Sequence, residues 1–445
     1  MTYVNRLQNV TVLGAGGKMG SGILLLTAME MTDLSLLPEN KDKDFIINAV
    51  DVSDKALSGL MDFLKTQVTK AAEKKTVILR ETYKDRSDLI ENSDIINQYV
   101  FDVMKIVRCT TRLEPCYDST LIFEAIKEDP DLKVKILSQI VGNNKKSPWF
   151  FTNTSSIPIH ELDESAKLDG RILGFHFYNP PAVQKLAELI SSDSTQKEVI
   201  EFALQYAKKL RKTIVHSNDV AGFIGNGHFM RDALFGISEV ERLSEKGSFV
   251  EAVYKINKVS QDFLIRPMGI FQLVDYVGLD VCSYIMSVMN SRLSDQNLHS
   301  SLLDSLIVKG VVGGQFADGS QKDGLLKYEK GRPVGIYNPD EEEYTLISEF
   351  QEKCDKELGT LPKATLPWRA VIGNPAKKDI LSDHFKELNS MKTLGAELAG
   401  NYGEQSKKIA LQLVTDNVAR NEEDVNTILL TGFYHSYGPI NEYFK

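Results

Sequence analysis

Three side chains with complementary chemistry lie close together in the segment from Thr152 to Ile190. Ser155 supplies a hydroxyl, His176 an imidazole and Glu188 a carboxylate, and each stands in a short apolar stretch bounded by turn residues. A histidine beside a buried carboxylate can act as a base near neutral pH, because the acid fixes the tautomer of the ring and stabilises the imidazolium. The trio therefore indicates general-base chemistry.

Each of these residue types also has a common structural role. Serines gather before helices, where their oxygens cap free backbone N–H groups, and Ser156 looks like such a cap two residues before Pro158. This leaves Ser155 without an obvious structural duty. A single histidine in an apolar strand is more often a hydrogen-bonded core residue than a catalyst, and a single glutamate in an apolar run is often a surface charge on a helix. Only the three together, with a cofactor, favour catalysis.

A dinucleotide-binding arrangement is predicted near the start of the chain. The sequence VTVLGAGGKMGSG, from Val10 to Gly22, gives an apolar strand, a glycine turn and the start of a helix. Such glycines let a pyrophosphate approach the N-terminus of the helix. The spacing of Gly14, Gly16 and Gly20 is one residue longer than the common G-x-G-x-x-G fingerprint.

The next apolar strand, FIINAV, ends at Asp51. A carboxylate at that place accepts hydrogen bonds from an adenosine ribose and repels a 2′-phosphate, so we expect NAD rather than NADP. The structural alternative is that Asp51 caps the following helix together with Asp54.

The segments around the trio predict further strands of the same sheet. RILGFHFYN alternates like a strand and carries His176, WFFTNTSS predicts a strand that ends at Ser155, and TLIFEAI predicts one with Glu128 just beyond it. Ligands bind at the carboxyl ends of the strands in open α/β sheets, so Asp51, Glu128 and Ser155 are expected at one edge. Two polar stretches, 32–44 and 82–104, are predicted to be surface insertions.

Composition favours a globular enzyme of more than one domain. The chain has 445 residues, of which 42% are hydrophobic and 25% charged, and its net charge of −9 argues against non-specific binding to nucleic acid or to anionic membranes. The four cysteines form no Cys-x-x-Cys pair, so neither a disulfide framework nor a thiolate metal site is indicated. No apolar run is long enough to insert into a membrane and no leader is visible, so a cytoplasmic location is expected.

The second half of the chain is predicted to be helical. Val220 to about Met289 is nearly all helical, and Asn226 falls early in its first helix, where an amide can hold a substrate oxygen or make an ordinary interhelical hydrogen bond. Segment 324–344 is strand-like. The end of the chain weakly echoes RPMGIFQLVDYVG of the first helical part, which predicts a degenerate repeat.

The predicted fold class is thus an α/β Rossmann-type dinucleotide-binding domain followed by all-α helical domains, the second a degenerate tandem repeat of the first. The expected boundaries are 1–218 for the NAD-binding domain, 219–345 for the first helical domain and 346–445 for the repeat.

The combination resembles the NAD-dependent 3-hydroxyacyl-CoA dehydrogenase family from residue 8 to about 345. The matching motifs are the glycine turn with Met19-Gly20, Glu128, Asn153-Thr154-Ser155-Ser156, GFHFYNP from Gly174, Lys185 to Ile190, Gly222-Phe223-Ile224 with Asn226, and Pro267-Met268-Gly269 to Asp280. The separations of 21 residues from Ser155 to His176 and of 12 from His176 to Glu188 resemble those of the family.

The resemblance implies roles for individual residues. His176 would take the proton from a substrate 3-hydroxyl while hydride leaves C3 for the nicotinamide, and Glu188 would orient His176. Ser155 and Asn226 would hydrogen-bond the substrate oxygens. The residues implied at the cofactor are Glu128, Asn179 and Lys135. This accords with the pattern of the residues, since a base with its acid and a hydride acceptor are what oxidation of a secondary alcohol requires.

Several functions stay open at this point. The leading one is reversible oxidation of a 3-hydroxyacyl-CoA, and the alternative enzyme would act on a small free hydroxy acid such as a sugar acid. A non-catalytic NAD sensor or structural protein is disfavoured because all three residues of the trio are present. No segment resembles an enoyl-CoA hydratase, so a bifunctional β-oxidation protein is not expected. Smaller family members pair through the helical domain, so a tandem copy could replace a partner, and either a monomer or a homodimer is expected.

Overall fold

The chain folds into two compact units, Met1–Asp219 and Val220–Lys445. The computed structural model describes residues 1–293, 297–316 and 319–444. Each unit has its own hydrophobic core. Among the described residues, none of the helices has both the length and the apolar character that crossing a membrane would need.

The first unit is built on an eight-stranded sheet in the order β3-β2-β1-β4-β5-β6-β7-β8. The strands from β1 to β6 run parallel, β7 runs antiparallel to β6, and β8 is parallel to β7. Their bounds are β1 Asn9–Leu13, β2 Ile46–Val50, β3 Val107–Thr110, β4 Leu121–Glu124, β5 Trp149–Thr152, β6 Ile172–Phe177, β7 Leu186–Ile190 and β8 Thr213–Ser217. The order of the first six strands is that of the Rossmann fold, which confirms the predicted α/β domain.

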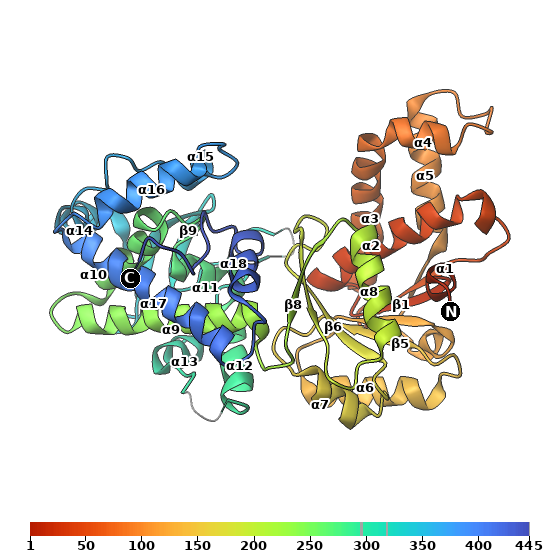
Figure 1. Ribbon diagram of the computed structural model, residues 1–445, viewed down its shortest axis with the longest axis horizontal. Helices are drawn as coiled ribbons and strands as arrows, with labels where there is room; N and C mark the ends of the chain where they lie inside the picture. Colours follow the sequence, from red (N-terminus) through yellow and green to blue (C-terminus); the bar gives the residue numbers. More distant parts are fainter. Residues whose placement is uncertain (294–296, 317–318, 445) are drawn as a thin grey trace. The chain divides into compact units, whose positions relative to one another are not determined.

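Helices cover both faces of this sheet (Figure 1). On one face α2, α3, α5 and α8 share a core with the strands, and α6 and α7 pack together on the other. Every residue of β4, β5, β6 and β7 is buried, as expected for strands with helices on both sides. The helices of the unit are α1 Tyr3–Arg6, α2 Lys18–Ser35, α3 Asp54–Lys74, α4 Thr76–Thr82, α5 Asn92–Ile106, α6 Pro130–Asn143, α7 Ile159–Ala166 and α8 Lys197–Lys209.

The predicted insertion at 82–104 is wrong, because most of that stretch forms α5. Ile95, Tyr99, Val103 and Ile106 lie on the buried face of this helix at helical spacing, and α5 packs against α3. Figure 1 shows α3, α4 and α5 together as a helical arm of the first unit. The stretch 32–44 begins inside α2, which continues to Ser35 before a short turn.

The second unit is mainly helical, as predicted, with one small antiparallel sheet in the order β11-β10-β9. Its helices are α9 Phe223–Ser244, α10 Phe249–Lys258, the π-helix η3 Val259–Phe263, α11 Ile270–Val277, α12 Leu279–Asn290, α13 Ser301–Val308, α14 Gln351–Leu358, α15 Trp368–Val371, α16 Lys377–Leu388, α17 Leu394–Thr415 and α18 Glu422–Thr431. Its strands, β9 Leu326–Glu329, β10 Arg332–Asn338 and β11 Glu343–Leu346, correspond to the strand-like segment 324–344.

One hydrophobic core runs through the whole second unit. It combines Phe229 and Met230 of α9 with Phe385 of α16 and Tyr402 of α17, so residues from both sides of the predicted boundary at 345 share it. Helix α17 packs along α9. The origin of residues 346–445 as a degenerate repeat stays a prediction.

Candidate functional site

The glycine turn connects β1 to α2 and is held by backbone hydrogen bonds. The N–H groups of Gly14 and Ala15 donate to the Val50 carbonyl at 2.8 and 3.0 Å, and the Gly17 N–H donates to the Gly14 carbonyl at 3.0 Å. Gly14 has a φ of +73°. A Cβ on Gly20 would overlap the Gly14 carbonyl, so the helix approaches the turn as closely as backbone allows.

This turn fits a bound pyrophosphate. Helix α2 begins at Lys18, and its cap residue Gly17 has no side chain to occupy the helix N-terminus. A Cβ on Gly16 would overlap the Cβ of Ala56, so the turn can pack this closely on α3 only because this residue is a glycine. An 18-residue helix whose amide end opens onto such a turn can bind a phosphate group.

Asp51 directly follows β2 and lies against the glycine turn. Its Oδ2 accepts the Gly16 N–H at 2.9 Å and its Oδ1 accepts the Ser53 N–H at 3.1 Å. Ser53, not Asp51, is the N-cap of α3, since its hydroxyl oxygen accepts the N–H of Ala56. The structural alternative for Asp51 as the cap of that helix is therefore wrong, and its contact with an adenosine ribose stays a prediction.

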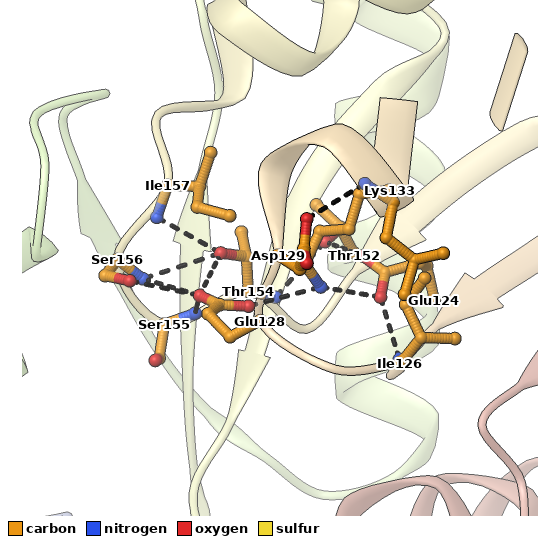
Figure 2. A network of polar contacts seen from close by, with 11 residues as sticks. Glu124, Ile126, Glu128, Asp129, Lys133, Thr152, Thr154, Ser155, Ser156 and Ile157 are labelled. Carbon is orange, nitrogen blue, oxygen red and sulfur yellow. Dashed lines mark hydrogen bonds and ion pairs between the residues drawn. The ribbon is translucent and has the colours of Figure 1, made fainter. Parts of the chain in front are cut away.

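Glu128 is the centre of a polar network that shapes the Ser155 loop (Figure 2). Its Oε1 accepts the Thr154 hydroxyl at 2.5 Å, the Ser155 N–H at 2.9 Å and the Ser156 N–H at 3.2 Å. The Ser156 hydroxyl also donates to this oxygen, at 3.1 Å. Ser156 is therefore not the helix cap that its position suggests, and the first N–H groups of α7 donate to Asp219 instead.

A buried lysine on α6 completes this network. Lys133 pairs with Glu124 at 2.7 Å and with Glu128 at 3.2 Å, and its side chain is only 1% exposed. Burial by itself raises the pKa of Glu128, but the Lys133 charge and the hydrogen bonds from Thr154 and Ser155 outweigh it and lower that pKa. Burial likewise lowers the pKa of Lys133, and the two glutamates more than reverse the effect.

The structure distinguishes Lys133 from Lys135, the lysine predicted from the sequence. Both lie on α6, but Lys135 is exposed and Lys133 is buried at the end of β4. A cofactor contact of Lys135 stays a prediction.

The Ser155 loop is also tied to the strand that carries His176. Asn153 follows β5, and its side-chain oxygen accepts the Phe177 N–H of β6 at 2.9 Å. In Figure 2 the Ser155 hydroxyl points away from Glu128, while its backbone N–H points toward it. Ser155 is half-buried.

His176 and Glu188 are directly opposite each other in the antiparallel pair of β6 and β7. The His176 Nδ1 lies 3.2 Å from the Glu188 Oε2. The Glu188 side chain is fully buried and that of His176 is 11% exposed. The same Oε2 accepts the hydroxyl of Tyr178 at 3.2 Å. The strand pairing therefore brings the predicted imidazole and carboxylate into contact.

Asn179 lies two residues beyond β6, half-buried, in the loop that leads to β7. The peptide bond from Asn179 to Pro180 is cis. Lys212 holds this loop by donating to the carbonyls of Pro181 and Gln184. The loop starts at the edge of the sheet where His176 lies, and the cofactor contact of Asn179 stays a prediction.

Asn226 belongs to the second unit, in the first turn of α9, and is half-buried. This turn begins at Gly222, whose φ is +84° and where a Cβ would overlap the side chain of Met289. Because Asn226 and His176 belong to different units, the role of Asn226 at the substrate stays a prediction.

Comparison with known proteins covers both units. Residues 9–220 match the family described as 3-hydroxyacyl-CoA dehydrogenase, NAD binding domain, and residues 222–322 match 3-hydroxyacyl-CoA dehydrogenase, C-terminal domain. A probable 3-hydroxyacyl-CoA dehydrogenase of Caenorhabditis elegans is 30% identical over 318 residues, which are 71% of this chain and 96% of the worm protein. The chain belongs to the 3-hydroxyacyl-CoA dehydrogenase family.

Two further relatives extend this comparison. The mitochondrial hydroxyacyl-coenzyme A dehydrogenase of Homo sapiens is 27% identical over 319 residues, 71% of this chain and 91% of the human protein. The crystal structure of 3-hydroxybutyryl-CoA dehydrogenase from Escherichia coli K12 has a TM-score of 0.64 with 20% identity, and the match covers 98% of this chain and 90% of that one. This second likeness shows the fold, across both units.

Family membership makes the chain an NAD-dependent oxidoreductase, as predicted. Within the residues that the structure describes, no group of three or more His, Cys, Asp or Glu side chains could hold a metal ion.

Four polar residues of this dehydrogenase-family site were not among the predicted site residues: Glu124, Lys133, Asn153 and Tyr178. Glu124 is the last residue of β4 and Asn153 directly follows β5. A polar residue at the end of a strand could have indicated both positions as candidates. Lys133 shares the helical spacing of the buried Leu137 and Ile140, and this also could have identified it.

Proposed function

We propose that this member of the family catalyses the reversible, NAD-dependent oxidation of a 3-hydroxyacyl-CoA to the 3-ketoacyl-CoA, with His176 as the general base. The observation that carries the proposal is the contact of His176 Nδ1 with Glu188 Oε2 across β6 and β7. With Nδ1 directed to the acid, Nε2 is the atom left to accept a proton from a substrate hydroxyl. The acyl-CoA substrate is supported by the names of the relatives.

Other residues of the chain would orient the base and hold the substrate. Glu188 orients His176 and stabilises its protonated form. Ser155 donates a hydrogen bond to the substrate oxygen from a loop that Glu128 and Asn153 hold in place. Asn226 is proposed as a further hydrogen-bond donor to the substrate. NAD, when bound, supplies the hydride acceptor for C3.

The cofactor is proposed to bind at the carboxyl edge of the sheet. Gly14, Gly16 and Gly20, with the N-terminus of α2, would hold the pyrophosphate, and Asp51 the adenosine ribose. At the other end of the cofactor, the Glu128 network and Asn179 would line the nicotinamide pocket.

An assay of NADH absorbance tests this proposal. The protein is given acetoacetyl-CoA with NADH, and in parallel a panel of small free hydroxy acids, including sugar acids, with NAD. We expect turnover of the thioester and little turnover of the free acids. Turnover of a free acid alone would overturn the CoA substrate, and NAD binding without turnover of either would favour a sensor.

We also propose that residues 346–445 are the degenerate repeat and cover the face of the helical domain that a partner subunit would otherwise cover. Helix α17 packs along α9, where Leu413 lies against Gly227 and the Tyr402 hydroxyl donates to the Asp232 carbonyl at 2.9 Å. Sedimentation velocity tests this, with a 49.8 kDa monomer expected. A tight dimer built on residues 220–289 would contradict it.

A cytoplasmic location is likewise proposed for this protein. The name of the human relative places that protein in mitochondria.

A further inference from the structure

Tyr178 contacts the same carboxylate oxygen as the proposed base. It lies one residue beyond β6, and its hydroxyl donates to Glu188 Oε2 at 3.2 Å, the distance at which His176 Nδ1 lies from that atom. The rings of His176 and Tyr178 are 4.9 Å apart between centroids and tilted by 40°. The two contacts thus reach the same oxygen of Glu188, His176 from the strand opposite and Tyr178 from the residue just beyond that strand.

We propose that Tyr178 is a positioning residue for the reaction: its hydroxyl fixes the Glu188 carboxylate toward His176 and takes a share of its negative charge. The inference rests on the proposed function, because it assigns a role in the same His176–Glu188 pair. The hydrogen bond from Tyr178 to the oxygen that faces His176 limits rotation about the last side-chain bond of Glu188, and so helps to keep a fixed partner for the imidazole.

The tyrosine is suited to be a permanent donor. Burial, with the charge of Glu188, raises the pKa of Tyr178 well above its ordinary value, so the phenol keeps its proton throughout the working pH range. A neutral donor withdraws charge from the carboxylate without competing for the proton that His176 must take up.

Other ionisable groups around the pair form a constant background. His216 lies on β8 beside β7, the His160–Asp219 pair lies at the start of α7, and Glu124, Glu128 and Lys133 form the network near β4 and β5. None of these is altered by replacing Tyr178 with phenylalanine, so a change of pH profile in that variant reports on the shared carboxylate.

Steady-state kinetics of Tyr178→Phe across pH test the proposal. We expect kcat for oxidation of 3-hydroxybutyryl-CoA to fall about tenfold with little change of KM, and the acidic limb of the kcat/KM profile to move to higher pH. The control is Tyr206→Phe, which removes another buried phenol of the first unit, bonded to Thr27 at 2.7 Å. It should lower stability and leave the profile unchanged. An unchanged profile in Tyr178→Phe would overturn the proposal.

A double-mutant cycle tests whether Tyr178 acts through Glu188. In the Glu188→Gln background, Tyr178→Phe should have almost no further effect on kcat, because the charge that it shares is gone. The same tenfold fall of kcat in both backgrounds would show that Tyr178 does not act through Glu188.

Nitrogen NMR of the free protein separates this proposal from the proposed function. The ¹⁵N signals of His176, identified by their loss in His176→Gln, report how fully the proton is held on Nδ1. We expect a smaller fraction of His176 to carry its proton on Nδ1 in Tyr178→Phe than in the unchanged protein. Identical signals would overturn the positioning role even in an active enzyme, and a change would uphold it even if no thioester were turned over.

Discussion

At the scale of single residues, the proposed base and its acid are held by strand pairing. Residues directly opposite in an antiparallel pair have Cβ atoms about 5 Å apart on the same face of the sheet. His176 and Glu188 are such a pair, with every residue of both strands buried, so neither side chain has room to leave. The contact is therefore a property of the sheet and needs no ligand to form.

Removing either partner should reduce turnover and spare cofactor binding. We expect His176→Ala or Glu188→Gln to lower kcat by about 10²–10⁴-fold, because that is the usual contribution of a general base. NAD affinity should stay nearly constant, since the glycine turn lies on other strands. Steady-state kinetics with a fluorescence titration of NADH measure both quantities. An equal loss of affinity would indicate a structural role.

Lys133 should matter far more to stability than Lys135. Lys133→Met leaves Glu124 and Glu128 without their buried counter-charge, which typically costs about 3–5 kcal/mol of the free energy of unfolding. The loss of stability should be largest at neutral pH and should shrink in acid. The pKa of Glu128 is lowered in the folded protein, so the ionised carboxylate stabilises the fold at pH values above the ordinary pKa of a glutamate. This contribution disappears as the pH falls and Glu128 becomes protonated.

Lys135→Met is the matched control on the same helix. Because Lys135 is exposed, this change should stay within about 0.5 kcal/mol in denaturant unfolding. A comparable loss of stability in both variants would contradict the buried role of Lys133. A loss of NAD affinity confined to Lys135→Met would support the cofactor contact predicted from the sequence.

At the scale of elements, some of the site followed from the sequence and some did not. The strands before Gly14 and Asp51 and around His176 were predictable because their apolar runs are bounded by turn residues. Helix α5 was missed because the polar stretch before it hides the helical spacing of its buried face. The apolar run around Glu188 was not assigned to an element from the sequence. Only pairing with β6 and β8 makes it β7 and gives Glu188 its neighbour.

The contact between the glycine turn and α2 makes a strong test of the cofactor site. We expect Gly20→Ala to lower NAD affinity at least tenfold and to destabilise the first unit, because the added Cβ would displace the Gly14 carbonyl and the helix start. Gly59→Ala is the control, in an exposed part of α3 where a Cβ meets nothing, and it should stabilise by about 0.5–1 kcal/mol. Unchanged NADH binding in Gly20→Ala would remove the turn from the proposed site.

At the scale of the whole molecule, the sequence pattern indicates where the first unit ends, but not the core that residues on both sides of the predicted boundary at 345 share. The change from alternating strands to helices near Val220 marks the start of the second unit. The shared core of residues 220–445 depends on long-range contacts that no local pattern reveals. Among them, Arg266 pairs with Asp232 of α9 at 2.8 Å and donates to Ser406 of α17 at 3.2 Å.

This buried arginine allows the unity of the second unit to be measured. Arg266→Met leaves Asp232 buried without its counter-charge and should cost about 3–5 kcal/mol, whereas Arg242→Met, which removes an ion pair on the exposed face of α9, should cost about 0–1 kcal/mol. Because α9 and α17 share one core, native-state hydrogen exchange should show both helices losing protection together in Arg266→Met. Loss of protection confined to α17 would instead mean that residues 346–445 unfold as a domain of their own. Joint loss would show that residues 394–415 stabilise α9, the helix that carries Asn226.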